Sequence, residues 1–122
     1  MICIIAGGRD YSFTPSDIVL LDKILEEYGM TEIVSGCARG ADTCGERWAA
    51  THNLPVKQFP ADWKKHGRVA GPIRNEEMAK YANMVILFPG GTGTNHMFKM
   101  AKKYRLHIID LREKTYDLQT FL

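Results

Sequence analysis

The sequence lacks the long hydrophobic runs that mark membrane proteins. No apolar stretch approaches the roughly 20 residues that span a bilayer. The apolar start over residues 2–5 is short and runs directly into Gly7-Gly8-Arg9-Asp10. We therefore expect no membrane segment and no secretory leader, and we expect a cytoplasmic protein.

Paired cysteines are also missing. The chain has three cysteines, Cys3, Cys37 and Cys44. Their odd number and unpaired spacing argue against a disulfide framework and suit a reducing compartment. No His or Cys pair completes a zinc site with Cys37 and Cys44, so we expect no metal and no required cofactor.

Strong charge and two well-known nucleotide motifs are absent as well. Sixteen basic and 14 acidic residues give a net charge of +2, too small to indicate nucleic acid or a membrane surface as the partner. The motif G-x-x-x-x-G-K-[ST] does not occur, and Gly36-x-x-x-Gly40 does not match G-x-G-x-x-G. These absences argue against an ATPase and a dehydrogenase.

The sequence does contain a regular alternation of strand-type and helix-type segments. Strands are predicted at 2–6, 32–35, 55–59, 84–88 and 107–111. Helices are predicted at 15–28, 41–52, 72–81 and 94–104, with a long polar loop over 61–71. The order and the apolar strands predict right-handed crossovers and a parallel sheet buried on both faces. We predict one α/β domain over residues 1–122, with a doubly wound, five-stranded parallel sheet and helices on both faces.

Glycines and unusual polar residues follow four of these strands, at 7–10, 35–42, 60–63 and 89–94. The carboxyl ends of parallel strands meet at one edge of the sheet, where ligands bind near the reversal of strand order. Pro89-Gly90-Gly91-Thr92-Gly93-Thr94 lies between a strand and a helix. Such a loop presents free N–H groups and a positive helix dipole to an anion. A plain turn would also use glycine, but three glycines and two threonines favour an anion site.

Three arginines stand beside these loops: Arg9, Arg39 and Arg74. The planar guanidinium group suits phosphate because it donates two parallel hydrogen bonds. Any one of them alone would suit a solvated surface charge equally well. Together with the glycine loops they indicate a phosphate-bearing ligand.

Several blocks of this sequence, in order, resemble the SLOG superfamily, which unites the DprA-like proteins and the Lonely Guy phosphoribohydrolases. The chain is most similar to the YspA/YpsA-related branch, over about residues 1 to 110. The blocks that carry the resemblance are residues 7–10, 35–42, 46–49, 59–63, 71–78 and 89–94. The resemblance implies a Rossmann-like sheet that binds a nucleotide or nucleotide-derived ligand at its glycine loops. It also implies a homo-oligomer, and residues 98–104 and 116–122 offer apolar surface for one.

The sequence departs from the Lonely Guy enzymes at the position of their catalytic acids. Their motif continues after PGGxGT with one residue and a pair of glutamates, and their preceding helix carries Arg-Lys-x-x-Met. Here Arg74 and Met78 match, Asn75 replaces the lysine, and His96 stands where the first glutamate is expected. Cleaving an N-glycosidic bond builds positive charge that a carboxylate stabilises, so the loss of both glutamates favours binding over hydrolysis.

Other acids remain candidates. Asp42 and Glu46 share one face of a helix near the second loop, and with Arg74 they are the catalytic candidates if the protein is an enzyme. Asp42 also suits a helix cap. Asp10 and Asp62 are placed to accept hydrogen bonds from ribose hydroxyls, and Trp63 either stacks on a base or packs on the sheet edge.

We thus expect most ligand contacts from the loop residues. The expected ligand-binding residues are Gly7, Gly8, Arg9, Asp10, Ser35, Gly36, Arg39, Gly40, Asp42, Asp62, Trp63, Arg74, Asn75, Pro89, Gly90, Gly91, Thr92, Gly93 and Thr94.

Three functions are compatible with these residues. The first is binding of an NAD- or ADP-ribose-like molecule, a cyclic nucleotide or a nucleoside monophosphate, as a sensor, a subunit or a sponge for a signal molecule. The second is a nucleotide N-glycosidase that uses a displaced acid. The third is single-stranded nucleic-acid binding, which the low net charge makes the weakest of the three.

Overall fold

The computed structural model describes residues 1–113, and the apolar segment 116–122 lies outside the described residues. Strands and helices alternate as the sequence predicts. The strands are β1 (Ile2–Ala6), β2 (Glu32–Ser35), β3 (Val56–Gln58), β4 (Met84–Leu87) and β5 (His107–Asp110). The helices are α1 (Pro15–Tyr28), α2 (Ala41–Thr51), α3 (Trp63–His66), the 3₁₀ turn η1 (Gly67–Val69), α4 (Ala70–Tyr81) and α5 (Thr92–Lys103).

The five strands form one parallel sheet in the order β3-β2-β1-β4-β5. Cys3 of β1 pairs with Ile33 of β2 on one side and with Met84 of β4 on the other. The chain winds outward from β1 to β3 and then returns to the other side of β1 through β4. This order confirms the predicted doubly wound sheet, and it puts the reversal of direction between β1 and β4.

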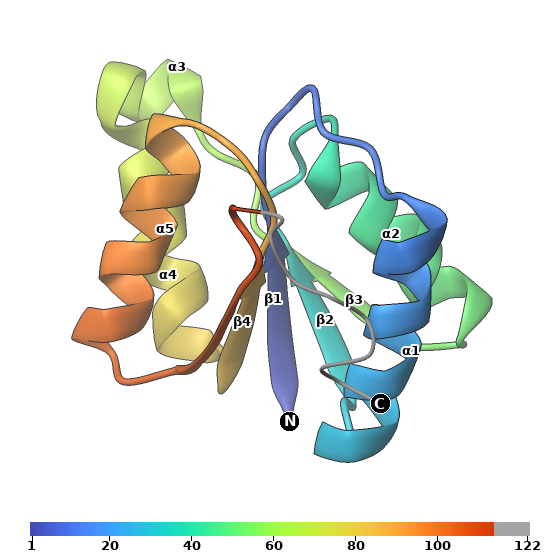
Figure 1. Ribbon diagram of the computed structural model, residues 1–122. Helices are drawn as coiled ribbons and strands as arrows, with labels where there is room; N and C mark the ends of the chain where they lie inside the picture. The colour runs from blue at the N-terminus through green and yellow to red at the C-terminus, as the bar shows by residue number, and fades with distance from the viewer. Residues whose placement is uncertain (114–122) are drawn as a thin grey trace.

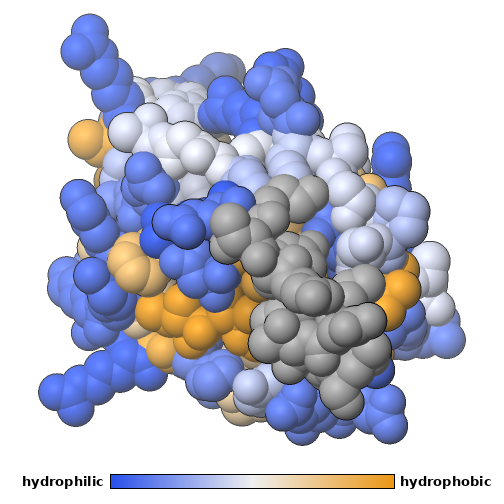
Figure 2. Space-filling model, viewed as in Figure 1, coloured by the Kyte–Doolittle hydropathy of each residue, from blue (hydrophilic) through white to orange (hydrophobic). Residues whose placement is uncertain are grey.

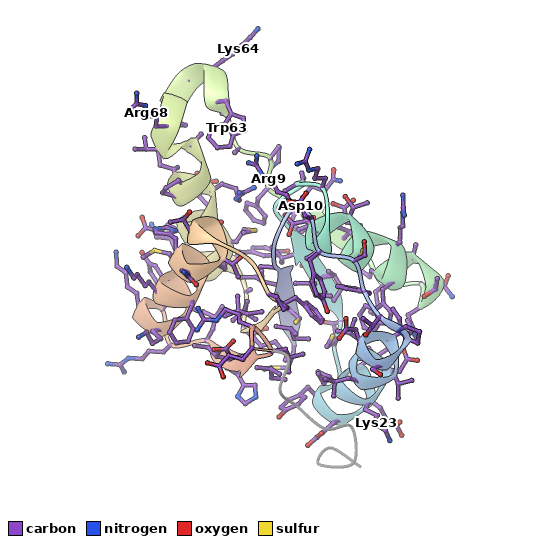
Figure 3. The ribbon with its side chains drawn as sticks, turned by 45° about the horizontal axis from the view of Figure 1, so that its top comes forward. Arg9, Asp10, Lys23, Trp63, Lys64 and Arg68 are labelled. Atoms are coloured by element: carbon purple, nitrogen blue, oxygen red, sulfur yellow. The ribbon has the colours of Figure 1, made fainter. Side chains whose placement is uncertain are left out.

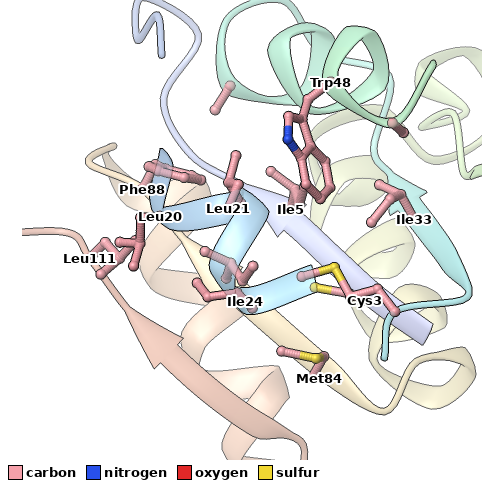
Figure 4. Packing of buried hydrophobic residues seen from close by; sticks show 14 residues of the cluster. Cys3, Ile5, Leu20, Leu21, Ile24, Ile33, Trp48, Met84, Phe88 and Leu111 are labelled. Atoms are coloured by element: carbon pink, nitrogen blue, oxygen red, sulfur yellow. The ribbon is translucent and has the colours of Figure 1, made fainter. Parts of the chain in front are cut away.

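Helices cover both faces of the sheet, with α1 and α2 on one face and α4 and α5 on the other (Figure 1). Successive side chains of a strand point to opposite faces. Accordingly, Cys3 and Ile5 join the core under α1 and α2 together with Leu20, Leu21 and Trp48 (Figure 4). Ile4 and Ala6 of the same strand belong to a second core beneath α4 and α5. Each strand of the centre is thus buried on both faces, as its apolar sequence indicates.

Local signals in the sequence explain the ends of α1. The Thr14 side chain accepts a hydrogen bond from the backbone N–H of Asp17, and the Asp17 carboxylate accepts one from the backbone N–H of Thr14. This reciprocal pair is a capping box. At the other end Gly29 adopts the left-handed conformation, with φ of 62°, which glycine tolerates best.

One prediction was wrong, namely that residues 61–71 form a long polar loop. Residues 63–71 form α3, the turn η1 and the first two residues of α4. The Asp62 carboxylate accepts a hydrogen bond from the Lys65 N–H and so caps α3. A short, exposed, charged helix has no apolar face, so the periodicity test does not detect it. The other predicted boundaries differ by at most two residues, which is the usual uncertainty of helix and strand ends.

The surface at the carboxyl ends of the strands is polar to near neutral, whereas an apolar area lies lower on the same face (Figure 2). Among residues 1–113, no helix has the length and apolar content needed to cross a bilayer. Within the same residues, no group of three or more His, Cys, Asp or Glu side chains is arranged to hold a metal ion.

Candidate functional site

The site is built at the carboxyl ends of β1, β2 and β4, where three loops meet. Two backbone hydrogen bonds join them: Gly8 N–H donates to the Pro89 carbonyl at 2.8 Å, and Ala41 N–H donates to the Gly8 carbonyl at 3.1 Å. The loop after β1 is therefore fixed between the other two. Ligands of doubly wound sheets bind at this kind of edge.

Four glycines allow this close packing, and we call their contacts the loop junction. A Cβ atom on Gly7 would lie 2.7 Å from the Ala41 Cβ, and one on Gly8 would lie 3.0 Å from the Pro89 carbonyl oxygen. A Cβ atom on Gly40 would lie 2.3 Å from the Gly8 carbonyl oxygen, and one on Gly90 would lie 2.7 Å from the Gly8 nitrogen. The distances at Gly7, Gly40 and Gly90 are shorter than real Cβ contacts, and the one at Gly8 is tight, so the glycines of the loop junction serve packing between loops.

Gly91 and Gly93 have different surroundings. A Cβ atom on either residue would meet no atom within 4 Å, and both residues line a pocket at the start of α5. The first N–H groups of a helix have no partner within the helix, and the helix dipole is positive there. This part of the loop therefore leaves open space beside donors that suit an anion.

That pocket, which we call the central pocket, has a volume of about 400 Å³. The end of β1, the three loops and the helices α2, α4 and α5 all contribute to its wall. Its lining residues are Ala6, Gly7, Gly8, Arg9, Ala38, Asp42, Arg74, Asn75, Met78, Gly91, Thr92, Gly93, Thr94 and Met97.

Arg74 and Asn75 of α4 connect the loops around the central pocket. The Arg74 guanidinium donates to the Gly36 carbonyl, and its Nε donates to the Asn75 Oδ1 at 3.0 Å. The Asn75 Nδ2 donates to the Gly93 carbonyl at 3.2 Å. Burial lowers the pKa of Arg74, with the neighbouring Asp42 acting in the opposite direction, and an arginine stays protonated at neutral pH. The pocket therefore keeps a positioned positive charge.

Asp42 is the buried carboxylate of the central pocket, with 7% of the residue exposed. Its Oδ2 accepts a hydrogen bond from the Ala38 N–H at 3.1 Å. Burial raises the pKa of Asp42 to about 6, although this hydrogen bond and Arg74 act against the rise. A carboxyl group with this pKa exchanges protons close to neutral pH, which is the property of an acid or base catalyst.

His96, which occupies the position of the missing glutamate, supports Asn75. Its Nδ1 lies 3.1 Å from the Asn75 Nδ2. Burial and the nearby Lys99 lower the pKa of His96, so the ring is neutral at neutral pH and its Nδ1 can accept the amide hydrogen. In this arrangement His96 orients a pocket residue.

A second pocket of about 320 Å³, which we call the side pocket, lies next to the central one. The two pockets have Arg9, Ala38 and Arg74 in common. The residues that line the side pocket are Arg9, Gly36, Cys37, Ala38, Arg39, Pro60, Ala61, Trp63 and Arg74. Burial, with Glu46 and Asp42 nearby, raises the pKa of the Cys37 thiol, which makes it a poor nucleophile.

The structure divides the residues that the sequence nominates. Most of them line one or both pockets. Those that line neither are Asp10, Ser35, Gly40, Glu46, Asp62, Pro89 and Gly90.

The polar residues outside the pockets have other partners. The Ser35 hydroxyl donates to a Glu46 carboxylate oxygen at 2.5 Å, and Gln58 Nε2 donates to the other oxygen at 3.2 Å. Asp10 pairs with Arg39 at 3.4 Å, and both side chains are largely exposed. Asp62 caps α3, as described above. Of the two acidic candidates for catalysis, the structure thus brings Asp42 and not Glu46 to the pocket.

Several pocket residues carry no polar signal in the sequence. Ala6, Met78 and Met97 line the central pocket, and Pro60 and Ala61 line the side pocket. The apolar ones follow the pattern of core residues. Ala6 ends β1, whereas Met78 and Met97 lie inside α4 and α5, and only the packing of these elements brings them to the pocket wall. Cys37, which has a φ of 65°, also lines the side pocket. In the sequence, only its position in a glycine-rich loop indicated that it lies near the site.

Comparison with known proteins gives one family and a shared fold. The sequence model described as "YspA, cpYpsA-related SLOG family" matches residues 1–66. The gene 61 protein of Mycobacterium phage D29 is 37% identical over 95 residues, which cover 71% of this chain and 75% of the phage protein.

Two solved structures share the fold. The X-ray structure of TM1055 has a TM-score of 0.64 at 15% identity, over 88% of this chain and 71% of that one. DNA processing protein A from Helicobacter pylori, described by its single-stranded DNA binding mode, has a TM-score of 0.65 at 19% identity, over 99% and 78% of the two chains. At these identities the two structures establish the fold alone, and they confirm the predicted Rossmann-like sheet.

Proposed function

Because the chain belongs to the YspA, cpYpsA-related SLOG family, we propose that it binds a nucleotide or nucleotide-derived ligand in the central pocket. The phosphoryl group of the ligand lies at the start of α5, beside Gly91 and Gly93. One observation carries this proposal: these two glycines leave open space at the amino end of a 12-residue helix, where a side chain would meet nothing.

The charges around the pocket support an anionic ligand. Arg9 and Arg74 line it together with one carboxyl group, that of Asp42. With a pKa of about 6 this carboxyl group is mostly ionised at neutral pH, but the two guanidinium groups outnumber it, so the balance of charge around the pocket is positive. Thr92 and Thr94 add hydroxyl groups at the same place.

Within this proposal the protein acts as a sensor, as a subunit of an assembly or as a sponge for a signal molecule. NAD- or ADP-ribose-like molecules, cyclic nucleotides and nucleoside monophosphates all carry the required phosphoryl group. The proposal includes that the protein forms a homo-oligomer and acts in the cytoplasm.

Binding is tested by native mass spectrometry and calorimetry with AMP, ADP-ribose, NAD and a cyclic dinucleotide. We expect at least one of them to bind, and we expect Arg74→Gln to weaken that binding about tenfold or more, because a charge-assisted contact is lost. Arg68→Gln is the matched control, since Arg68 is exposed and lines neither pocket. If the two variants lose affinity equally, the central pocket is not the binding site.

The geometry of Asp42 favours a second candidate, hydrolysis of an N-glycosidic bond. Asp42 lines the pocket that also contains Arg74, and its pKa of about 6 suits proton transfer or stabilisation of a cationic transition state. The test is release of free base from nucleoside monophosphates. Free base from the wild type and none from Asp42→Asn would establish the enzyme. Bound nucleotide without free base supports the binding function.

A further inference from the structure

We propose that the natural ligand is a dinucleotide-type molecule with two phosphoryl groups, whose phosphoryl chain crosses from the central pocket into the side pocket and whose base stacks on Trp63. This inference depends on the proposed nucleotide-binding function and narrows its ligand class. A pyrophosphate-bridged molecule and a cyclic dinucleotide share the required chemistry, and the experiment below separates them.

The first argument is that the two pockets lie next to each other. Arg9, Ala38 and Arg74 belong to the wall of both, so the two pockets are neighbours and only these three residues are shared between them. Each volume, about 400 and about 320 Å³, lies near the lower end of the roughly 300–1,000 Å³ found for small-molecule sites. A ligand that fills both has the size for which such sites are built.

The second argument is the charge of the side pocket. Three guanidinium groups line it, those of Arg9, Arg39 and Arg74, and none of its lining residues in the described part of the chain is acidic. The acidic groups around it are Asp10, which pairs with Arg39 at 3.4 Å on the exposed side, and Asp42 and Glu46, which lie near Cys37. A phosphoryl group in the central pocket leaves Arg39 without an anionic ligand group, whereas a second phosphoryl group between Arg9 and Arg39 uses all three cations.

The third argument is the position of Trp63. Its exposed fraction is 51%, compared with 3% for Trp48 in the core. Figure 3 shows Trp63 on the side of α3 that faces the loop of Arg9, while Lys64 points away from it. One edge of the ring approaches α4, because its Cη2 atom lies 3.5 Å from the place of a Cβ on the buried Gly71. An exposed indole beside three arginines suits stacking with a nucleobase.

The experiment measures the affinities of the full chain for AMP, ADP-ribose and cyclic di-AMP by calorimetry. We expect one of the two ligands with two phosphoryl groups to bind at least about tenfold more tightly than AMP. Tighter binding of ADP-ribose would indicate a linear pyrophosphate-bridged ligand, and tighter binding of cyclic di-AMP would indicate a cyclic dinucleotide. The intrinsic fluorescence of Trp63 should fall on binding, and Trp63→Phe should abolish this change, since Trp48 is buried.

Variants of the side pocket separate this inference from the proposed function. Trp63→Leu should weaken the tighter ligand about tenfold or more, because stacking is lost, while Trp63→Phe retains most of the affinity. Arg39→Gln should weaken the same ligand several-fold and should leave AMP little changed. Lys64→Ala and Arg68→Gln are controls of similar exposure outside both pockets, and we expect no effect from them. Thermal unfolding of each variant shows that it is folded.

Three results would overturn the inference in different ways. Equal affinity for AMP and for both larger ligands, unchanged by Trp63→Leu, would overturn it while the proposed function stands. Failure of every nucleotide to bind would overturn both. Tighter binding of an oligothymidine than of any small ligand, with a steep dependence on salt, would replace the dinucleotide by single-stranded nucleic acid.

Discussion

At the loop edge of the sheet, the glycines of the loop junction lie against atoms of neighbouring segments, whereas Gly91 and Gly93 face open space. The residue type is the same, but the consequences for the protein are opposite. At the junction glycine allows three loops to pack together, and at the start of α5 it leaves room for something that is not protein. A glycine-rich sequence therefore overstates the number of ligand contacts, because part of its glycine serves the packing of the loops on one another.

The largest effect should come from the junction. Gly40 has a φ of 79°, and a Cβ atom there would lie 2.3 Å from the Gly8 carbonyl oxygen. Backbone strain and overpacking should together lower the free energy of unfolding of Gly40→Ala by about 3 kcal/mol or more. Urea unfolding measures this.

Gly29→Ala is the matched control for Gly40→Ala. Gly29 also has a positive φ, 62°, but a Cβ atom there would meet nothing within 4 Å. Gly29→Ala should lower the free energy of unfolding only through backbone strain, by roughly 1 kcal/mol. If both variants lose the same amount, the close packing of the loop junction has no energetic importance.

A smaller effect, an increase in stability, is expected when Asp42 in the wall of the central pocket is replaced. The pKa of Asp42 is about 6 in the folded protein and 3.8 in the reference state. Above pH 6 the buried carboxylate is ionised at a cost, and below about pH 4 it is protonated in both states. The free energy of unfolding of Asp42→Asn at pH 8 should therefore exceed that of the wild type by roughly 2–3 kcal/mol. The difference should fade between pH 6 and pH 4.

Urea unfolding at pH 8 and pH 4 tests this sign. Asp10→Asn is the control, because the Asp10 side chain is almost fully exposed, and we expect little change from it at either pH. A variant Asp42→Asn that is less stable than the wild type at pH 8 would show that the ionised carboxylate contributes to the fold.

The smallest effect on stability, with a separate effect on binding, is expected at Gly93. This residue lies in the first turn of α5, and an alanine there meets no atom. Gly93→Ala should raise the free energy of unfolding by roughly 0.5–1 kcal/mol, because alanine favours the helix. Its methyl group should at the same time reduce nucleotide affinity measured by calorimetry, since it takes up the proposed phosphate space.

Gly45→Ala provides the contrast for Gly93→Ala. Gly45 also lies in a helix, α2, but a Cβ atom there would lie 2.9 Å from Ile5 Cγ2 in the core. We expect that substitution to destabilise the protein. If Gly93→Ala is also destabilising, the space beside Gly93 is required by the protein itself and is not kept for a ligand.

Much of the fold is visible in the sequence because local signals agree with one another. The apolar strands, Thr14 before α1 and Gly29 after it all point to the same arrangement. The segment 61–71 was misjudged because α3 is short and exposed, so no alternation of apolar and polar residues marks it. Helix α5 starts at Thr92, two residues before the predicted start. Threonine and glycine are weak helix formers, so the sequence does not show that the helix already includes them.

The site was predicted less completely than the fold. The sequence marks the loops of the pocket, Arg74 and Asn75, but it cannot rank Asp42 above Glu46, which lies one turn later on the same helix. The structure turns Asp42 to the pocket and pairs Glu46 with Ser35 and Gln58. Ser35 lies in β2 and Gln58 in β3. Which acid faces the pocket therefore depends on how α2 packs against the sheet.

The sequence alone determined the parallel sheet, the edge that carries the glycine loops and the family to which the chain belongs. These depend on hydrophobic periodicity, turn residues and motif order, which are local properties of the chain. Only the tertiary structure decided which glycines pack and which remain open, which acid is buried beside Arg74, and that Trp63 lies at a pocket next to the first. Those properties depend on distances between segments far apart in the sequence, and such distances are fixed only when the loops from β1, β2 and β4 meet.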